Sequence, residues 1–173
     1  YVANAQSGTV SVIDAASRRV VKTVSVNPAG RLNSVLVSAD GTVLYVSDAK
    51  AGTVTLFTLP EMHKAAEIPV RLFPQRMAFS PQQNRLYVVN SASNNVSVID
   101  AAAQTLLANI PVSERPYGIV LAPDQRRAYV TSSQTQRITV LDLVSHAAID
   151  TIALNAVSRL TNLVISPDGQ YLY

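Results

Sequence analysis

The chain has 173 residues, of which 48% are hydrophobic and only 14% are charged, and its formal net charge is +3. This composition excludes a disordered chain, which would be poor in apolar and rich in charged residues. The chain has no cysteine, which excludes disulfides, thiolate metal sites and thiol nucleophiles. No apolar run approaches the ~20 residues that a membrane-spanning helix needs.

A tyrosine in a common context recurs along the chain. It stands at Tyr1, Tyr45, Tyr87, Tyr129 and Tyr173, so the spacings are 44, 42, 42 and 44 residues. A segment of the type Val-Ser-Val-Ile-Asp starts nine residues after each of the first four tyrosines, and a turn of the type Ser-Pro-Asp-Gly precedes each later tyrosine. The chain therefore divides into four repeats, which span residues 1–44, 45–86, 87–128 and 129–172.

Each repeat predicts four β-strands. Starting in the third repeat, short apolar runs cover 106–112, 117–121, 128–131 and 138–141, and turn residues separate them. The runs are apolar on both faces, which a sheet with one solvated face would not show. No segment keeps the 3.6-residue period of a helix. Four strands in a repeat of about 40–45 residues predict an all-β fold, a β-propeller built of four-stranded antiparallel blades.

The turn residues agree with this prediction. Asp40-Gly41 and Asp168-Gly169 are expected to supply the positive φ of a tight hairpin. Gly8, Gly52 and Asn94 occupy one equivalent position in another hairpin, and all three tolerate the left-handed region better than other residues do. These positions predict where strands reverse.

The motifs as a set resemble the YVTN family of bacterial and archaeal β-propellers. Tyr-Val-x-Asn, x-Val-Ser-Val-Ile-Asp, Ile-Pro-Val, Pro-Tyr-Gly-Ile-Val and Ser-Pro-Asp-Gly all occur, and the resemblance covers the whole chain. It implies a secreted, periplasmic or cell-surface protein and a ring that commonly has seven blades. It implies no particular activity, because relatives include surface-layer proteins, nucleic-acid-binding proteins, lactonase-like enzymes and haem d1-binding domains.

Four repeats leave three arrangements open. The chain is part of a larger ring of seven or eight blades, or two copies complete an eight-bladed ring, or four blades close on themselves. In the last case Leu160–Ser166 would pair beside Tyr1–Asn4. An open half-ring exposes apolar blade faces, which predicts self-association.

The acidic residues and histidines do not predict a catalytic or metal site. Most carboxylates end the repeated strands or form turns, and the remaining ones are not expected to meet as an acid–base pair. His63 and His146 fall in outer turns, whereas a metal or haem ligand is expected near the central channel. We therefore predict no catalytic residue, no metal and no cofactor in this chain.

Arginine precedes the predicted innermost strand in three of the four repeats. These residues are Arg31, Arg115 and Arg159, and Phe73 takes the position in the second repeat. In a propeller this position lies on the top face near the mouth of the central channel, and guanidinium groups bind carboxylates and phosphates through paired hydrogen bonds. Repeats one and four lengthen this loop at 27–30 and 155–158. The polar residues expected to complete the candidate site are Asn33, Tyr117 and Asn162.

These features favour a non-enzymatic binding or scaffold propeller of the cell envelope, periplasmic or cell-surface, whose partner is a protein or an anionic small molecule or polymer. Nucleic acid is a poorer fit, because the basic residues are scattered and few exposed aromatics lie among them. One alternative is a catalytic or cofactor-binding propeller, lactonase-like or of the haem d1 type, with its active residues outside this chain. The second is a structural surface-layer or adhesion repeat.

Overall fold

The computed structural model describes residues 1–155 and 159–173, and the regular structure in that part of the chain is entirely β. None of these residues forms a helix long and apolar enough to cross a membrane. In chain order the strands are β1 (Val2–Asn4), β2 (Thr9–Asp14), β3 (Arg19–Ser25), β4 (Leu32–Val37), β5 (Val43–Asp48), β6 (Thr53–Thr58), β7 (His63–Pro69), β8 (Pro74–Ser80), β9 (Arg85–Asn90), β10 (Asn95–Asp100), β11 (Thr105–Pro111), β12 (Pro116–Leu121), β13 (Arg127–Ser132), β14 (Arg137–Asp142) and β15 (Ala147–Ala153).

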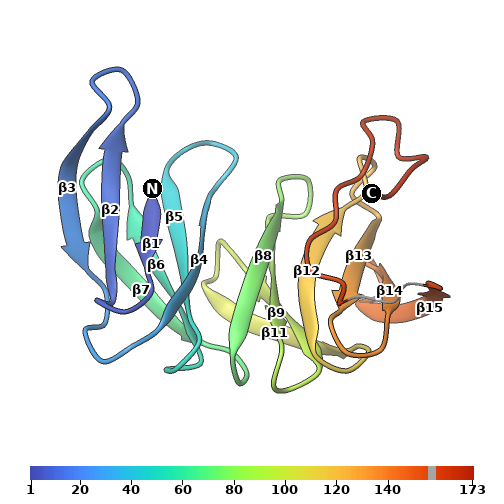
Figure 1. Cartoon of the computed structure of the whole chain (residues 1–173). Helices are drawn as coiled ribbons and strands as arrows, with labels where there is room; N and C mark the ends of the chain where they lie inside the picture. Colours follow the sequence, from blue (N-terminus) through green and yellow to red (C-terminus); the bar gives the residue numbers. More distant parts are fainter. Residues whose placement is uncertain (156–158) are drawn as a thin grey trace.

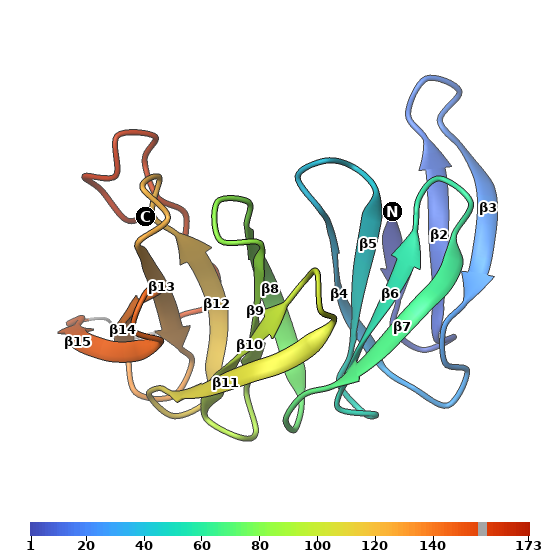
Figure 2. The same ribbon diagram turned by 180° about the vertical axis from the view of Figure 1, so that it is seen from behind.

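The strands form four antiparallel sheets that follow one another along an arc (Figure 1). The first sheet has the order β1-β2-β3, and the other three are four-stranded meanders, β4 to β7, β8 to β11 and β12 to β15. The innermost strands β4, β8 and β12 lie next to one another (Figure 2). The predicted all-β propeller fold with four-stranded antiparallel blades is confirmed.

Burial of both faces of each sheet explains why polar and apolar residues do not alternate along the strands. Along β9 the run Leu86–Val89 is fully buried. Leu86 and Val88 belong to a core shared with β5, β6 and β7, whereas Tyr87 and Val89 belong to a core shared with β13 and β14. Successive side chains of a strand point to opposite faces, so each sheet is packed between its two neighbours.

The predicted turn positions have the expected backbone. Gly41 and Gly169 have φ of 75°, and Gly8, Gly52 and Asn94 have φ of 63°, 70° and 52°. Gly52 and Asn94 follow the second strand of their sheets, and Gly8 follows β1, which has the equivalent place in the three-stranded first sheet. The sequence therefore located these reversals correctly.

The closed four-bladed ring is wrong. Leu160–Ser166 does not pair with Tyr1–Asn4, and its one bridge joins Ile165 to Leu172 in a hairpin. The first sheet lacks an innermost strand, and the two termini lie on different sheets along the arc (Figure 1). The reason is geometric, because four sheets in this arc do not turn far enough to bring the last strand back to the first.

Candidate functional site

A cavity of about 500 Å³ opens between the third and fourth sheets, and we call it the mouth cavity. It lies on the face that carries the loops 70–73 and 112–115, which precede β8 and β12. The hairpin turns 91–94 and 133–136 reach the same face, because antiparallel strands alternate in direction. The volume is in the range of small-molecule sites.

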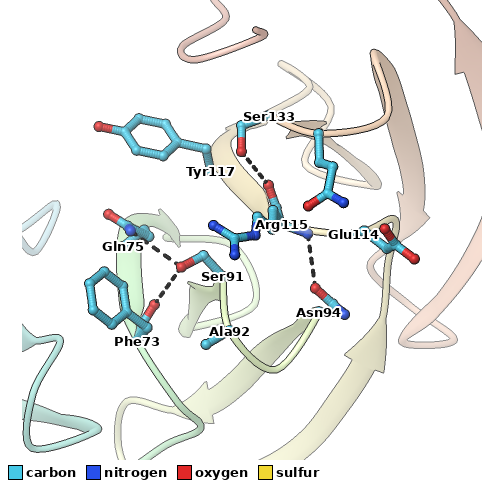
Figure 3. A pocket seen from close by; sticks show the side chains of 10 residues that line it. Phe73, Gln75, Ser91, Ala92, Asn94, Glu114, Arg115, Tyr117 and Ser133 are labelled. Atoms are coloured by element: carbon cyan, nitrogen blue, oxygen red, sulfur yellow. Dashed lines mark hydrogen bonds between the residues drawn. The ribbon is translucent and has the colours of Figure 1, made fainter.

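Arg115 is the basic residue that lines the mouth cavity. Its backbone has a φ of 48°, and it is held from both sides. The N–H donates to Asn94 Oδ1 at 2.9 Å, and the carbonyl accepts from Ser133 N and Oγ, both at 3.0 Å. The guanidinium points into the space between Gln75, Ser91 and Tyr117 (Figure 3). It has no hydrogen bond or ion pair with the described residues, so its donors are available to a ligand.

The wall opposite Arg115 is polar and hydrogen-bonded. Ser91 Oγ donates to the carbonyl of Phe73 at 3.2 Å and accepts from Gln75 Nε2 at 3.3 Å. The other end of the Gln75 amide accepts from Asn33 Nδ2 at 3.0 Å, and Asn33 also donates to the carbonyl of Pro74 at 3.0 Å. Asn33 lies on β4 and Gln75 on β8, so this chain of hydrogen bonds links two sheets and fixes the orientation of the Gln75 amide.

Two further arginines stack on aromatic rings at this face. The guanidinium of Arg31 lies over the ring of Phe73, 5.4 Å from its centroid. The guanidinium of Arg76, on β8, lies 6.0 Å from the ring centroid of Tyr117. Such contacts are attractive because the ring face is electronegative. Phe73 and Tyr117 both line the mouth cavity, so Arg31 and Arg76 each contact a residue of its lining.

The acidic residue of the cavity faces elsewhere. Glu114 precedes Arg115 and also lines the mouth cavity. Its carboxylate is directed away from the guanidinium of Arg115 (Figure 3). The carbonyl of Glu114 accepts a hydrogen bond from Ser132 Oγ, which holds the loop 112–115 against the next sheet. Arg115 is therefore not neutralised from within the site.

The structure brings four of the six predicted site residues to this region. Arg115 and Tyr117 line the mouth cavity, Asn33 holds Gln75 in its wall, and Arg31 covers Phe73. The other two, Arg159 and Asn162, are exposed and do not line it. Their ligand-binding roles remain predictions.

Asn162 lines a different cavity of about 270 Å³, together with Leu160, Leu163 and Tyr173. That cavity is mostly apolar, so it does not continue the polar site at Arg115. The predicted long loop 155–158 includes residues 156–158, which lie outside the described residues. Arg159 follows directly after them.

Sequence reasoning did not select Gln75, Ser91 or Arg76 for the site. Gln75 and Arg76 follow Pro74 at the start of an innermost strand. Their position next to the predicted site loop could have identified them. Ser91 follows Asn90, which occupies the repeated Tyr-Val-x-Asn position. The prediction covered the loop before each innermost strand and the start of that strand, and it did not include the adjacent hairpin turns.

Within residues 1–155 and 159–173, no group of three or more His, Cys, Asp or Glu side chains is placed to hold a metal ion. His63 is exposed at the start of β7, and His146 lies in the turn before β15 with a φ of 52°. Both histidines are therefore on the outer part of their sheets, as expected.

The family model described as "Lactonase, 7-bladed beta-propeller" matches residues 1–114. The chain belongs to this family. The match extends through the first three sheets, up to Glu114 beside the mouth cavity.

A solved structure supports the lactonase-family assignment at the level of the fold. Hydrazine synthase of Kuenenia stuttgartiensis matches with a TM-score of 0.76 and 31% sequence identity over 80% of this chain. The chain spans 40% of the length of that protein. A comparison with curated proteins gives no significant match. The family description names a seven-bladed propeller, and the described residues of this chain form four sheets.

Proposed function

We propose that this lactonase-family propeller binds a small organic anion in the mouth cavity. The observation that carries the proposal is the guanidinium of Arg115, which points into a cavity of about 500 Å³ without a partner among the described residues. A guanidinium offers donors in a fixed planar geometry that matches a carboxylate or phosphate. The anion would therefore bind through paired hydrogen bonds to Arg115.

The surroundings of Arg115 support an organic anion with hydroxyl groups. Gln75, Ser91 and Ser133 add polar atoms to the lining, and Tyr117 adds an aromatic face. Arg31 and Arg76 contribute positive charge behind the two rings. Ligand sites of this kind combine a few placed polar groups with apolar surface. A polyhydroxy carboxylate would use both the placed polar groups and the apolar surface of this cavity.

We place this binding module at the cell envelope, periplasmic or on the cell surface, as a non-enzymatic protein. This setting is supported by the resemblance of its repeats to those of YVTN propellers. A partner protein or polymer could present the same anionic group to the cavity. The rigid sheets would supply the scaffold and the loops would supply the specificity.

Lactone hydrolysis is the second candidate function, and the family match favours it. Arg115 could hold the carbonyl oxygen of a lactone and then the carboxylate of the hydroxy acid that hydrolysis releases. Activating the water requires a general base. Glu114 is directed away from Arg115 (Figure 3), so the base would come from another part of the ring.

Calorimetric titration with gluconate and with inorganic phosphate tests the anion proposal. Arg115→Gln should weaken binding at least tenfold, because a charge-assisted hydrogen bond contributes about 1.5–3 kcal/mol. Arg127→Gln is the matched control, since Arg127 is exposed at the start of β13 and does not line the cavity. Equal losses in both variants would show a net-charge effect and would contradict the proposal.

Turnover of γ-butyrolactone, followed in a pH-stat, separates the two candidate functions. A binding module leaves the spontaneous rate of ring opening unchanged. A hydrolase accelerates it, and Arg115→Gln should then reduce the acceleration. Anion binding without acceleration supports the first candidate.

A further inference from the structure

A second cavity, of about 330 Å³, lies between the second and third sheets, and we call it the turn cavity. It is formed where β4 turns into β5 and where β8 turns into β9, at the ends of the sheets opposite the mouth cavity. Asp40, Tyr45, Phe79 and Ala101 are among its lining residues. The rings of Tyr45 and Phe79 stack with centroids 5.9 Å apart.

The equivalent space at the next junction is filled by the protein itself. Forty-two residues after Ala101 stands Leu143, which is only 1% exposed. The backbone confirms the equivalence, because Ala101 N donates to the carbonyl of Asn84 at 3.1 Å and Leu143 N donates to the carbonyl of Arg126 at 2.9 Å. Alanine at 101 therefore leaves out a side chain that the neighbouring junction has.

A glutamine fills the rest of the neighbouring junction. The hydroxyl of Tyr87 donates to Gln83 Oε1 at 2.7 Å, and Gln83 Nε2 donates to the carbonyl of Gln125 at 3.0 Å. The residue equivalent to Gln83 beside the turn cavity is Gly41, which has no side chain. The second junction therefore lacks an internal carboxamide as well as a leucine.

The absent carboxamide leaves Tyr45 without a partner. Tyr45 is equivalent to Tyr87 and is 2% exposed, yet its hydroxyl makes no hydrogen bond with the described residues. Burial, and secondly the nearby Asp40 carboxylate, raise the pKa of Tyr45, so the hydroxyl remains a donor at neutral pH. The Tyr45 hydroxyl lines the open turn cavity and keeps contact with solvent there, so it is free to donate to an acceptor placed in the cavity.

Asp40 provides the complementary acceptor. Its Oδ1 accepts from Ser38 Oγ at 2.5 Å and from Thr42 N at 3.1 Å, which holds the turn. Its second oxygen, Oδ2, belongs to the same carboxylate, which is among the groups that line the turn cavity. A donor placed in the turn cavity would find this oxygen, whereas a carboxylate there would be repelled by Asp40.

We propose that the turn cavity binds a small neutral molecule that carries a primary carboxamide. Its carbonyl accepts from the hydroxyl of Tyr45, as Gln83 accepts from Tyr87, and its NH₂ donates to Asp40. The body of the ligand occupies the volume that Leu143 fills at the next junction. This site is separate from the mouth cavity and does not depend on the function proposed for it.

Ligand-observed saturation-transfer NMR with benzamide and benzoate tests this proposal on the full chain. Benzamide should bind and the isosteric benzoate should bind at least tenfold more weakly. Tyr45→Phe removes the donor and keeps the ring, so it should weaken benzamide binding about tenfold, the effect of one hydrogen bond. Tyr87→Phe is the matched control at the filled junction and should leave the affinity unchanged.

Ala101→Leu is the second variant and should abolish binding by filling the cavity. Leu143 shows that the fold accepts leucine at this position, and a melting curve confirms that the variant is folded. No benzamide binding at millimolar concentration would overturn the proposal. Equal binding of benzamide and benzoate, or binding that neither Tyr45→Phe nor Ala101→Leu changes, would also overturn it.

Discussion

The backbone N–H of Arg31 donates a hydrogen bond of 2.8 Å to the carboxylate of Asp48. Asp48 is fully buried, and its oxygens also accept from Asn27 Nδ2 and from the N–H groups of Lys50 and Ala51. The carboxylate thus holds the loop before β4 and the turn after β5 together. Ser132, at the equivalent position of the fourth sheet, holds the loop before β12.

Asp48→Asn should destabilise the protein by about 1–3 kcal/mol at pH 7, because an amide cannot accept all of these hydrogen bonds. Burial acts to raise the pKa of Asp48, but the hydrogen bonds, led by that from Arg31, lower it overall. A folded pKa below the unfolded value means that this stability is present above about pH 4 and is lost as the pH falls through the folded pKa. Urea unfolding of both proteins at pH 7 and pH 3 should show the difference narrowing at pH 3. Equal stability of the parent protein and Asp48→Asn at pH 7 would contradict the stabilising role of these hydrogen bonds.

Arg115→Gln and Arg159→Gln should differ in their effect on anion affinity, although both arginines were predicted to bind the ligand. Arg115 lines the mouth cavity, whereas Arg159 is exposed and does not. We expect Arg115→Gln to lose anion affinity and Arg159→Gln to retain it within a factor of about two, since an exposed charge outside the cavity acts only through a screened field. The measurement is a gluconate titration at 0.15 M salt. A comparable loss in Arg159→Gln would show that the site extends beyond the cavity.

Gly8→Ala should be much more harmful than Gly41→Ala, although both glycines have positive φ. A Cβ at Gly8 would lie 1.8 Å from the carbonyl oxygen of Asn27, whereas a Cβ at Gly41 would have no atom within 4 Å. Gly41→Ala should therefore cost only the left-handed strain, about 1 kcal/mol. Gly8→Ala must also displace the loop before β4 and should cost at least twice as much. Thermal unfolding of the two variants measures the difference, and equal melting temperatures would count against the close contact at Gly8.

Tyr87→Phe should change how stability depends on alkaline pH. Burial raises the pKa of Tyr87 to about 12, with Arg85 acting in the opposite direction. Because the folded pKa exceeds the unfolded value of about 10, the stability linked to this group is complete below pH 10 and is lost as the pH rises toward 12. Tyr87→Phe should cost about 1 kcal/mol at neutral pH through the lost bond to Gln83. Denaturant midpoints from pH 8 to 11.5 should fall less steeply in the variant than in the parent protein. Parallel curves for the two proteins would show that Tyr87 does not cause the loss of stability at alkaline pH.

The fold was predictable because the repeat is regular. Equivalent residues recur at 42 or 44 positions, so the strand pattern of one repeat predicts the others. The strand predicted at Leu160–Ser166 is where this reasoning fails. A strand requires a neighbour to pair with, and here only the Ile165–Leu172 bridge forms.

The candidate site was only partly predictable. Arg115 and Tyr117 share a cavity because both lie at the start of the same innermost strand. Arg159 has the same place in the repeat as Arg115, and Asn162 follows it by three residues, but no following sheet encloses them in the described chain. Gln75 and Ser91 depend on contacts between two sheets, which a one-dimensional pattern does not specify.

The difference between Ala101 and its equivalent Leu143 shows that equivalent positions of this fold can vary independently. Because each sheet packs only on its immediate neighbours, a volume removed at one junction is not transmitted to the next. Leu143 is buried at its junction, whereas the junction that contains Ala101 has a packed core and an open cavity at its turn end. A protein of this kind can gain or lose a binding pocket at one junction through a few side chains, here Ala101 and Gly41, while the packing at its other junctions is unchanged.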